Sequence, residues 1–473
     1  MVHLDGDITV RDGHLVFDGV DVVALARRVA TPFFLFSPRR IRWNISAMVN
    51  AFTRRHLDTE IFFASKACSN LWFLGEVRRA GINLEVNSGG ELWKARRAGF
   101  DPAQIIFNGV AKTRDEIRSA VEAGVRALVV DSVYELERIA EVAATVGRPA
   151  PVDLRVDVNV ATLTHPGLVT AHGGKPGIDL DDALAAFAFA GAHEALEPRG
   201  LHLHIGSQIT GVEPYIAAVE KGLDLIEAVE AAGVPLDHLN AGGGFAIPYR
   251  DQPVCEPVDY FCSALTIDDY AEAICGLLER RRPDLKLLLE PGRSIAGNAA
   301  LLVTTIENTK VKGRRDAAGR RVGDERWLTV DAGFNTLLEH TNYRWYYRTV
   351  VANRAAEAAD TPFRLAGPLC DGGDVFAGDD ETPYRSFPAA TAPGDIVVFF
   401  DAGAYSLEMM NPYNARPTAA AYAAHEGEAQ MIRAADTLDD LIARDIEPGR
   451  SSAPTTASRG GGKAPAGKAP AGR

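Results

Sequence analysis

Lys66, in the stretch FFASKACSN, places an ammonium group directly after an apolar run. A lysine at the end of a buried strand is uncommon unless it is paired or takes part in chemistry. Burial lowers the pKa of such an amine, and a lysine of this kind can form a Schiff base with a carbonyl compound. The ordinary alternative is a lysine that ends a strand and extends its ammonium group to solvent, and Lys66 alone does not distinguish the two.

Two glycine-containing clusters follow later apolar runs and could bind an anion. NAGGGFAIPY holds Gly242, Gly243 and Gly244, whose backbone N–H groups an anion can approach closely. EPGRS adds Arg293, and neither cluster has the spacing of a nucleotide-binding loop, so the pattern favours a phosphate group. Glu290 precedes the proline of EPGRS, and its carboxylate needs a partner if it is buried. That partner could be Arg293 or a protonated heterocyclic nitrogen.

Three further residues could move or hold a proton. Cys370 in GPLCDGGD lies beside acidic residues, which raise the pKa of a thiol and favour a proton donor over a nucleophile; the alternative is an unreactive core cysteine. His202 and His204 stand two positions apart in HLHIGSQ, and we expect their side chains to have different surroundings. We therefore expect no metal site, with His204 facing the site and His202 pointing toward the surrounding helices.

The elements that must position these residues form a repeating pattern from Arg39 to Gly297. Short β-branched runs alternate there with amphipathic segments such as LWFLGEVRRAG, and eight runs are strand-like: EIFFAS, NLEVNS, IIFNG, ALVVDS, VDLRVDV, GLHLHIG, HLNAGGG and LKLLLEPG. Apolar strands joined by helices are typical of a parallel sheet, and eight such units over roughly 250 residues predict an α/β fold, a (β/α)8 barrel. A doubly wound open sheet is the alternative. A barrel gathers its site at the carboxyl ends of its strands, where the polar clusters stand.

The remaining segments predict a second, mostly β domain assembled from both chain ends. Strand-like runs with turn signals between them follow Gly297, among them ALLVTTIENT, ERWLTVDAG and GDIVVFFDAGAY, and ITVRDGHLVFDG stands at the N-terminus. The segment RSSAPTTASRGGGKAPAGKAPAGR shows no apolar periodicity and predicts a disordered tail. The predicted parts are residues 1–37, N-terminal strands of the β domain; 38–297, the barrel; 298–449, the C-terminal β domain; and 450–473, the tail.

Composition narrows the class of protein. A formal net charge of −13 disfavours nucleic acid as a partner, because a phosphate backbone is bound by clustered cations. No apolar run approaches the roughly 20 residues of a membrane span, and the first residues lack the pattern of a signal peptide, so we expect a cytoplasmic protein. The five cysteines are widely spaced and are expected to be free thiols.

Seven motifs together resemble one known family. FFASKACSN, LEVNSGGEL, GLHLHIGSQ, LNAGGGF, EPGRS, GPLCDGGD and DAGAY, in this order, are similar to motifs of the alanine-racemase-like (fold type III) pyridoxal-phosphate-dependent decarboxylases. This family contains the diaminopimelate, ornithine and arginine decarboxylases. The resemblance implies a pyridoxal 5'-phosphate enzyme with a small-molecule amino-acid substrate, working as a homodimer with shared active sites. A racemase would not need Cys370, and a cofactor-free regulatory homologue would have lost residues that this chain retains.

The resemblance also implies a role for each matching residue. Lys66 would bind the cofactor covalently, and Glu290 would pair with the pyridine nitrogen so that the ring can accept electrons. Cys370 would act as a proton donor in the neighbouring subunit's site. The other implied contacts are Gly242, Gly243, Gly244, Ser207, Arg293 and Tyr405 with the phosphate, His204 with the ring, Glu85 with the region of the lysine, and Asp371 and Tyr405 with the substrate.

One departure from the family bears on the substrate. Diaminopimelate decarboxylases carry an Arg-Pro-x-x-Tyr segment whose arginine binds the distal carboxylate, whereas FNTLLEHTNYRWYYR puts Glu339 in the place of that arginine and Tyr343 in the place of the tyrosine. An acid there favours a distal ammonium group, which predicts lysine or ornithine as the substrate and cadaverine or putrescine as the product. Arg344 or Arg348 could still meet a distal carboxylate.

Other segments bear on the configuration of the substrate. FNGVAKT, LVTAHGGKPGIDLDDA and CDGGD look closest to the D-ornithine/D-lysine decarboxylases, which predicts a D-configured substrate. The alternatives are a meso-diaminopimelate decarboxylase and a decarboxylase of specialised metabolism on the same scaffold.

Overall fold

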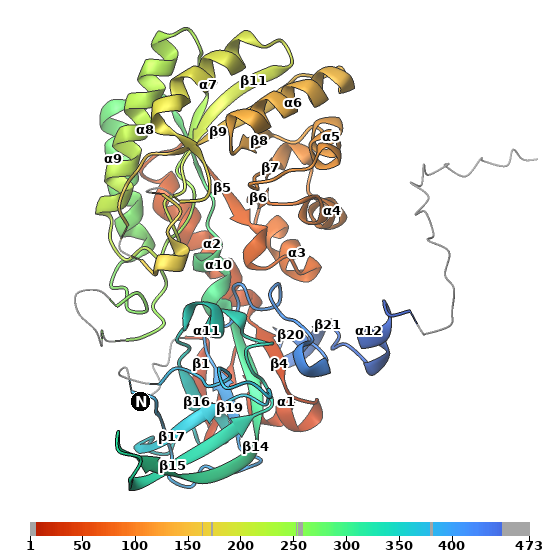
Figure 1. Cartoon of the computed structure of the whole chain (residues 1–473), viewed down its shortest axis with the longest axis vertical. Coiled ribbons are helices and arrows are strands. Elements are labelled where there is room, and N and C mark those ends of the chain that lie inside the picture. The colour runs from red at the N-terminus through yellow and green to blue at the C-terminus, as the bar shows by residue number, and fades with distance from the viewer. Residues whose placement is uncertain are drawn as a thin grey trace, which may run out of the picture.

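The computed structural model describes residues 6–162, 164–171, 174–251, 253, 259–378 and 382–446, in a barrel unit and a mostly β unit (Figure 1). The predicted tail at 450–473 lies outside the described residues. None of the helices in the described part of the chain is long and apolar enough to cross a membrane.

Eight parallel strands form a closed barrel, as the sequence predicts, and an open sheet is thereby excluded. The pairing of β8 with β9 and of β13 with β5 completes the ring, and a short strand, β10 (Ile178–Asp179), extends it beside β9. The strands are almost wholly buried because helices cover the outside and side chains fill the inside. Their bounds are β5 (Thr59–Ala64), β6 (Asn83–Val86), β7 (Ile105–Phe107), β8 (Ala127–Val130), β9 (Ala150–Asp157), β11 (Leu196–His202), β12 (His238–Asn240) and β13 (Lys286–Leu289).

Amphipathic helices surround the barrel (Figure 1). Several begin at a residue whose side chain accepts a backbone N–H of the first turn: Ser88 accepts from Glu91, and Ser132 from Glu135. Such caps fix where each helix begins, and therefore where the preceding strand-end loop must turn. The helix bounds are α2 (Pro38–Thr53), α3 (Leu71–Arg79), α4 (Gly89–Arg97), α5 (Arg114–Ala123), α6 (Val133–Val146), α7 (Leu180–Ala192), α8 (Glu213–Ala231) and α9 (Ile267–Arg281).

The second unit is built on a nine-stranded sheet that includes one N-terminal strand. Strand β4 lies between β14, to which it is antiparallel, and β20, to which it is parallel. The sheet contains β4 (Phe33–Phe36), β14 (Ala300–Arg315), β15 (Arg321–Val330), β16 (Thr349–Val351), β17 (Thr361–Ala366), β18 (Arg385–Phe387), β19 (Ile396–Phe399), β20 (Ala420–His425) and β21 (Glu428–Arg433). The short helices are α1 (Val22–Arg28), α10 (Arg293–Ala296), α11 (Leu338–Tyr343) and α12 (Leu438–Ile442).

The N-terminal segment ITVRDGHLVFDG does not enter this sheet as a strand. It forms a separate sheet from β1 (Ile8–Arg11), β2 (His14–Phe17) and β3 (Val20–Asp21), and its apolar side chains pack in one cluster with those of β4 and β14. The expectation that both chain ends build the β unit is therefore met. The N-terminal strand that enters the nine-stranded sheet is, however, β4, with the sequence FFLF.

The β unit contacts the barrel unit at the segment that carries Lys66. The Tyr405 N–H, from the loop after β19, donates to the Ala67 carbonyl (2.8 Å). The Glu408 carboxylate accepts from the Ser69 N–H and from its hydroxyl, both at 2.7 Å, and Lys94 donates to the same hydroxyl. The β unit thus holds the segment on which the candidate lysine lies.

Candidate active site

Lys66 lies directly after β5, in a single 3-10 turn, where its Nζ is 3.8 Å from Oε1 of the buried Glu85 on β6. Burial alone would lower the pKa of Lys66, but the nearby carboxylates, Glu85 foremost, outweigh it and raise that pKa. Burial raises the pKa of Glu85 to about 8, and its Oε1 receives no hydrogen bond from any described residue. The structure therefore brings Lys66 and Glu85 together, and an unsatisfied buried acceptor faces the amine.

Glu290 follows β13, and both of its carboxylate oxygens are bound. His202 Nε2 lies 3.0 Å from Oε2, and the Asn240 amide donates to Oε1 (2.8 Å). Burial alone would raise the pKa of Glu290, but His202 and the other partners lower it to about 2. The carboxylate therefore stays charged inside the barrel, as it must to stabilise a protonated ring nitrogen.

His202 corrects one expectation from the sequence. It is fully buried, and its Nε2 faces Glu290 and, at 3.4 Å, the Asn108 amide, so it points into the barrel and not toward the helices. Residues two apart in a strand share a face, so strand alternation gives no reason to separate His202 from His204, and β11 in any case ends at His202. Beyond the strand, His204 Nδ1 accepts from the Gly243 N–H (3.3 Å), and burial lowers its pKa well below the usual range. His204 is thus a neutral ring held in one orientation.

The triple glycine forms a tight turn after β12. Gly242 and Gly244 adopt left-handed backbone conformations with φ of +68° and +95°. A Cβ on Gly243 would clash with the Glu290 carbonyl oxygen. The Gly242 N–H is used by Asn240 Oδ1 (2.9 Å), and Ser207 lies beside the turn in the loop that carries His204. Neighbouring backbone thus fills the space that a side chain would need, so the turn requires glycine.

Arg293 and Glu339 are not free to act as the sequence suggested. Glu339 Oε1 accepts from Arg293 Nη2 (2.7 Å) and Oε2 from Nη1 (3.0 Å), and Nη1 also donates to the Tyr249 hydroxyl (2.9 Å). The arginine therefore has a carboxylate in place of the predicted phosphate, and the glutamate has an arginine in place of the predicted substrate ammonium. The two residues are 46 apart in sequence, so only the fold reveals their pairing.

Tyr405 contacts both Arg293 of this pair and the segment that carries Lys66. Its ring lies 4.8 Å from the Arg293 guanidinium carbon, and its N–H holds the residue after Lys66. Its backbone is left-handed (φ +57°), which is unusual for a residue with a side chain and marks a constrained position. Tyr405 thus lies beside the segment of Lys66, while its contacts with phosphate and substrate stay predictions.

Cys370, Asp371 and Tyr343 do not join these residues within the single chain. Cys370 and Asp371 are exposed, and the Cys370 N–H donates to Asn414 Oδ1 (2.8 Å) in its own unit. Tyr343 ends α11 and packs edge-on against His165 at 5.5 Å between ring centres. The roles that the sequence gave these residues stay predictions.

Arg155 is a residue of this site that the sequence analysis missed. It lies on β9, and burial lowers its pKa while the charges of Asp131, Glu290 and Glu85 oppose that shift. The signal was present in VDLRVDV, where every second residue is charged although the strand is otherwise apolar. Such a pattern in a barrel strand points polar side chains inward.

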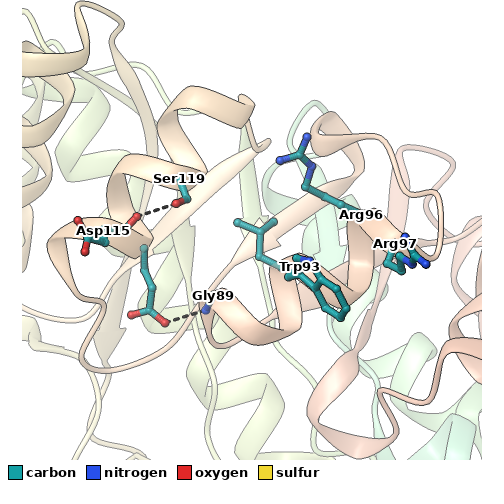
Figure 2. A pocket seen from close by; sticks show the side chains of 8 residues that line it. Gly89, Trp93, Arg96, Arg97, Asp115 and Ser119 are labelled. Carbon is teal, nitrogen blue, oxygen red and sulfur yellow. Dashed lines mark hydrogen bonds between the residues drawn. The ribbon is translucent and has the colours of Figure 1, made fainter. Parts of the chain in front are cut away.

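A groove of about 630 Å³ on the outer surface lies apart from this constellation. Residues of α4 and α5 line it, and Trp93 is 64% exposed beside Arg96 and Arg97 (Figure 2). Its lining residues belong to two covering helices, and none of them is a member of this constellation.

The chain belongs to the pyridoxal-dependent decarboxylases. Residues 39–297 match the family model for their pyridoxal binding domain, and residues 251–403 match the model for their C-terminal sheet domain. The protein is thus a pyridoxal-phosphate-dependent amino-acid decarboxylase, as the motifs predict.

Its relatives carry a more specific name. The chain is 37% identical to the diaminopimelate decarboxylase of Pseudomonas aeruginosa, over 92% of this chain and 97% of that one, and 34% identical to the enzyme of Archaeoglobus fulgidus, over 91% and 96%. The crystal structure of diaminopimelate decarboxylase from M. jannaschii matches with a TM-score of 0.83 and 31% identity, covering 94% of this chain and 98% of that one. The expected nearest likeness, to D-ornithine/D-lysine decarboxylases, is therefore not what the comparisons show.

The site fits the cofactor of this family. Pyridoxal phosphate supplies an electron sink when it is bound. Lys66 would provide the amine that binds it, and Glu290, whose pKa is lowered to about 2, would hold a proton on its ring nitrogen. His204 presents a neutral ring, and the glycine turn packs closely against the strand ends that carry His204 and Glu290.

Proposed function

We propose that this enzyme decarboxylates meso-diaminopimelate at its D-configured end. Similarity to diaminopimelate decarboxylases over nearly the whole length of both chains carries the proposal, because it includes both structural units. Cytoplasmic localisation and a homodimer are parts of the same proposal.

The proposed roles follow the geometry of the barrel mouth. Lys66 binds the cofactor, and Glu290, held by His202 and Asn240, keeps the ring nitrogen protonated. His204 lies against the ring, and the glycine turn with Ser207 binds the phosphate. Cys370, which is exposed on its own chain, donates a proton in the partner's site, with Asp371 contacting the substrate there.

D-lysine or D-ornithine is the second candidate, and one observation favours it. Glu339 stands where the resemblance places a carboxylate-binding arginine, and it also occupies Arg293. With Glu339 in place of that arginine, the site has lost one cation and gained one anion relative to the family pattern. This change disfavours the binding of a distal carboxylate.

A substrate panel tests both candidates. Purified enzyme with pyridoxal phosphate is given meso-diaminopimelate, D-lysine, D-ornithine and L-lysine, and carbon dioxide and the amine product are measured. We expect turnover of meso-diaminopimelate and none of L-lysine. Turnover of D-lysine or D-ornithine alone would replace the first candidate by the second, and no turnover with bound cofactor would contradict both.

A further inference from the structure

The ion pair of Arg293 and Glu339 is buried and electrically neutral. Both side chains are 3% exposed, and the carboxylate takes two parallel hydrogen bonds from the guanidinium. The Arg293 guanidinium carbon also lies 4.3 Å from the centre of the Trp345 ring. The arginine is thus held in place on several sides, with its charge cancelled by one acid.

This pair lies one layer of side chains from Lys66. A Cβ on Gly292, the residue before Arg293, would lie 3.2 Å from the Ala67 Cβ and 3.3 Å from the Tyr405 hydroxyl. Tyr405 in turn packs against the guanidinium and is bonded to the backbone next to Lys66. Burial lowers the pKa of His165, and the charge of Glu339 opposes that shift. The pair therefore belongs to the wall of the reaction site and not to a distant core.

A free guanidinium in this wall would be a strong receptor for a substrate carboxylate. Arginine binds carboxylates through two parallel hydrogen bonds, and here Glu339 already makes that contact. A substrate carboxylate must displace Glu339 or bind without Arg293, whereas an uncharged or cationic end meets no such competitor. The residue at position 339 therefore affects whether the site binds a substrate whose distal end carries a carboxylate or one whose distal end is uncharged or cationic.

We propose that Glu339 is a specificity-determining residue: by occupying Arg293 it weakens the hold on a distal carboxylate and lets the enzyme accept diamino acids that lack one. This rests on the proposed decarboxylation of a D-configured diamino acid. The chemical class it adds is a diamino acid with a single carboxylate, with D-lysine as the probe.

The test is a charge cycle at the two positions. Glu339→Gln frees the arginine, so the ratio of kcat/KM for meso-diaminopimelate to kcat/KM for D-lysine should rise at least about tenfold, chiefly through KM for meso-diaminopimelate. Arg293→Gln leaves the acid unopposed and should lower the ratio by about as much. The double variant restores neutrality and should return the ratio to within about threefold of wild type, and Glu339→Asp, which keeps the charge, should resemble wild type.

The outcomes separate this inference from the proposed function. Circular dichroism and thermal melting establish that each variant folds; if Glu339→Gln does not, Arg293→Gln and the neutral double variant decide the question. A ratio that stays constant across the folded variants, with decarboxylation intact, overturns the role of Glu339. Absence of any decarboxylation by the wild-type enzyme overturns the proposed function instead.

Discussion

At the scale of single residues, the site is organised by which buried charges have partners. Glu290 has two donors and a pKa of about 2, whereas Glu85 has an unsatisfied oxygen and a pKa of about 8. Two buried carboxylates near one lysine thus hold different protonation states near neutral pH. With pKa values this far apart, Glu290 is suited to hold a negative charge and Glu85 is suited to exchange a proton.

The amine of Lys66 is the group most directly tested. Lys66→Ala should abolish the near-visible absorption of lysine-bound pyridoxal phosphate and reduce turnover at least about a thousandfold, because no other described lysine lies beside Glu85. Absorbance scans and carbon dioxide release measure this. Lys286→Ala, which removes a lysine paired with Glu60 where β13 begins, should keep the absorption band. A band that persists in Lys66→Ala would show that another amine binds the cofactor.

The charge of Glu290 is the second residue-scale prediction. Glu290→Gln keeps the size of the side chain but loses the anion, so cofactor should still bind while kcat falls by about a hundredfold or more. Cofactor titration and steady-state kinetics separate the two effects. Glu60→Gln removes a barrel carboxylate near the beginning of β5 and should leave kcat within about twofold. Equal losses in the two variants would reduce Glu290 to a structural role.

At the scale of elements, the sequence predicts those strands that are determined by the residues within them and next to them. The eight barrel strands were found from sequence because each is a short, wholly buried run between turn signals. The place of β4 between β14 and β20 depends on partners hundreds of residues away, so the sequence pattern did not reveal it. The predicted orientation of His202 was wrong because residues two apart in a strand lie on one face, so alternation could not put His202 outside and His204 inside. Lys66, Glu85 and Glu290 were predictable because they follow the strands or lie on them, whereas the pairing of Arg293 with Glu339 joins two units.

The glycine turn after β12 gives the prediction at this scale. Gly243→Ala places a Cβ against the Glu290 carbonyl, which must move the strand end that carries the carboxylate, so the free energy of unfolding should fall by about 1–3 kcal/mol and cofactor affinity should drop. Gly276→Ala in α9 meets only the end of Arg280 and should be neutral or stabilising by up to about 1 kcal/mol. Urea unfolding and cofactor titration compare the two. Equal behaviour of the variants would mean that the turn adapts to a side chain.

At the scale of the whole molecule, the chain separates its proposed catalytic groups. Lys66 lies in the barrel unit under the loop of Tyr405, while Cys370 is exposed on the β unit with its backbone held by Asn414. A proton donor on the surface of one chain can serve a buried site only if another chain brings it there. The proposed homodimer would complete each barrel with the partner's thiol, and neither chain would then work alone.

Mixing two inactive variants tests this arrangement. Cys370→Ala should retain cofactor but form little amine, and Lys66→Ala should lack the bound cofactor. Because a mixed dimer pairs one intact lysine with one intact cysteine in a single site, mixing the variants through a reversible dissociation step should recover about a quarter of wild-type turnover at a one-to-one ratio. Sedimentation establishes the dimer, and mixing each variant with itself is the control. If the mixture stays inactive although mixed dimers form, both groups must act in the same chain, and the loop of Cys370 would have to move toward its own barrel.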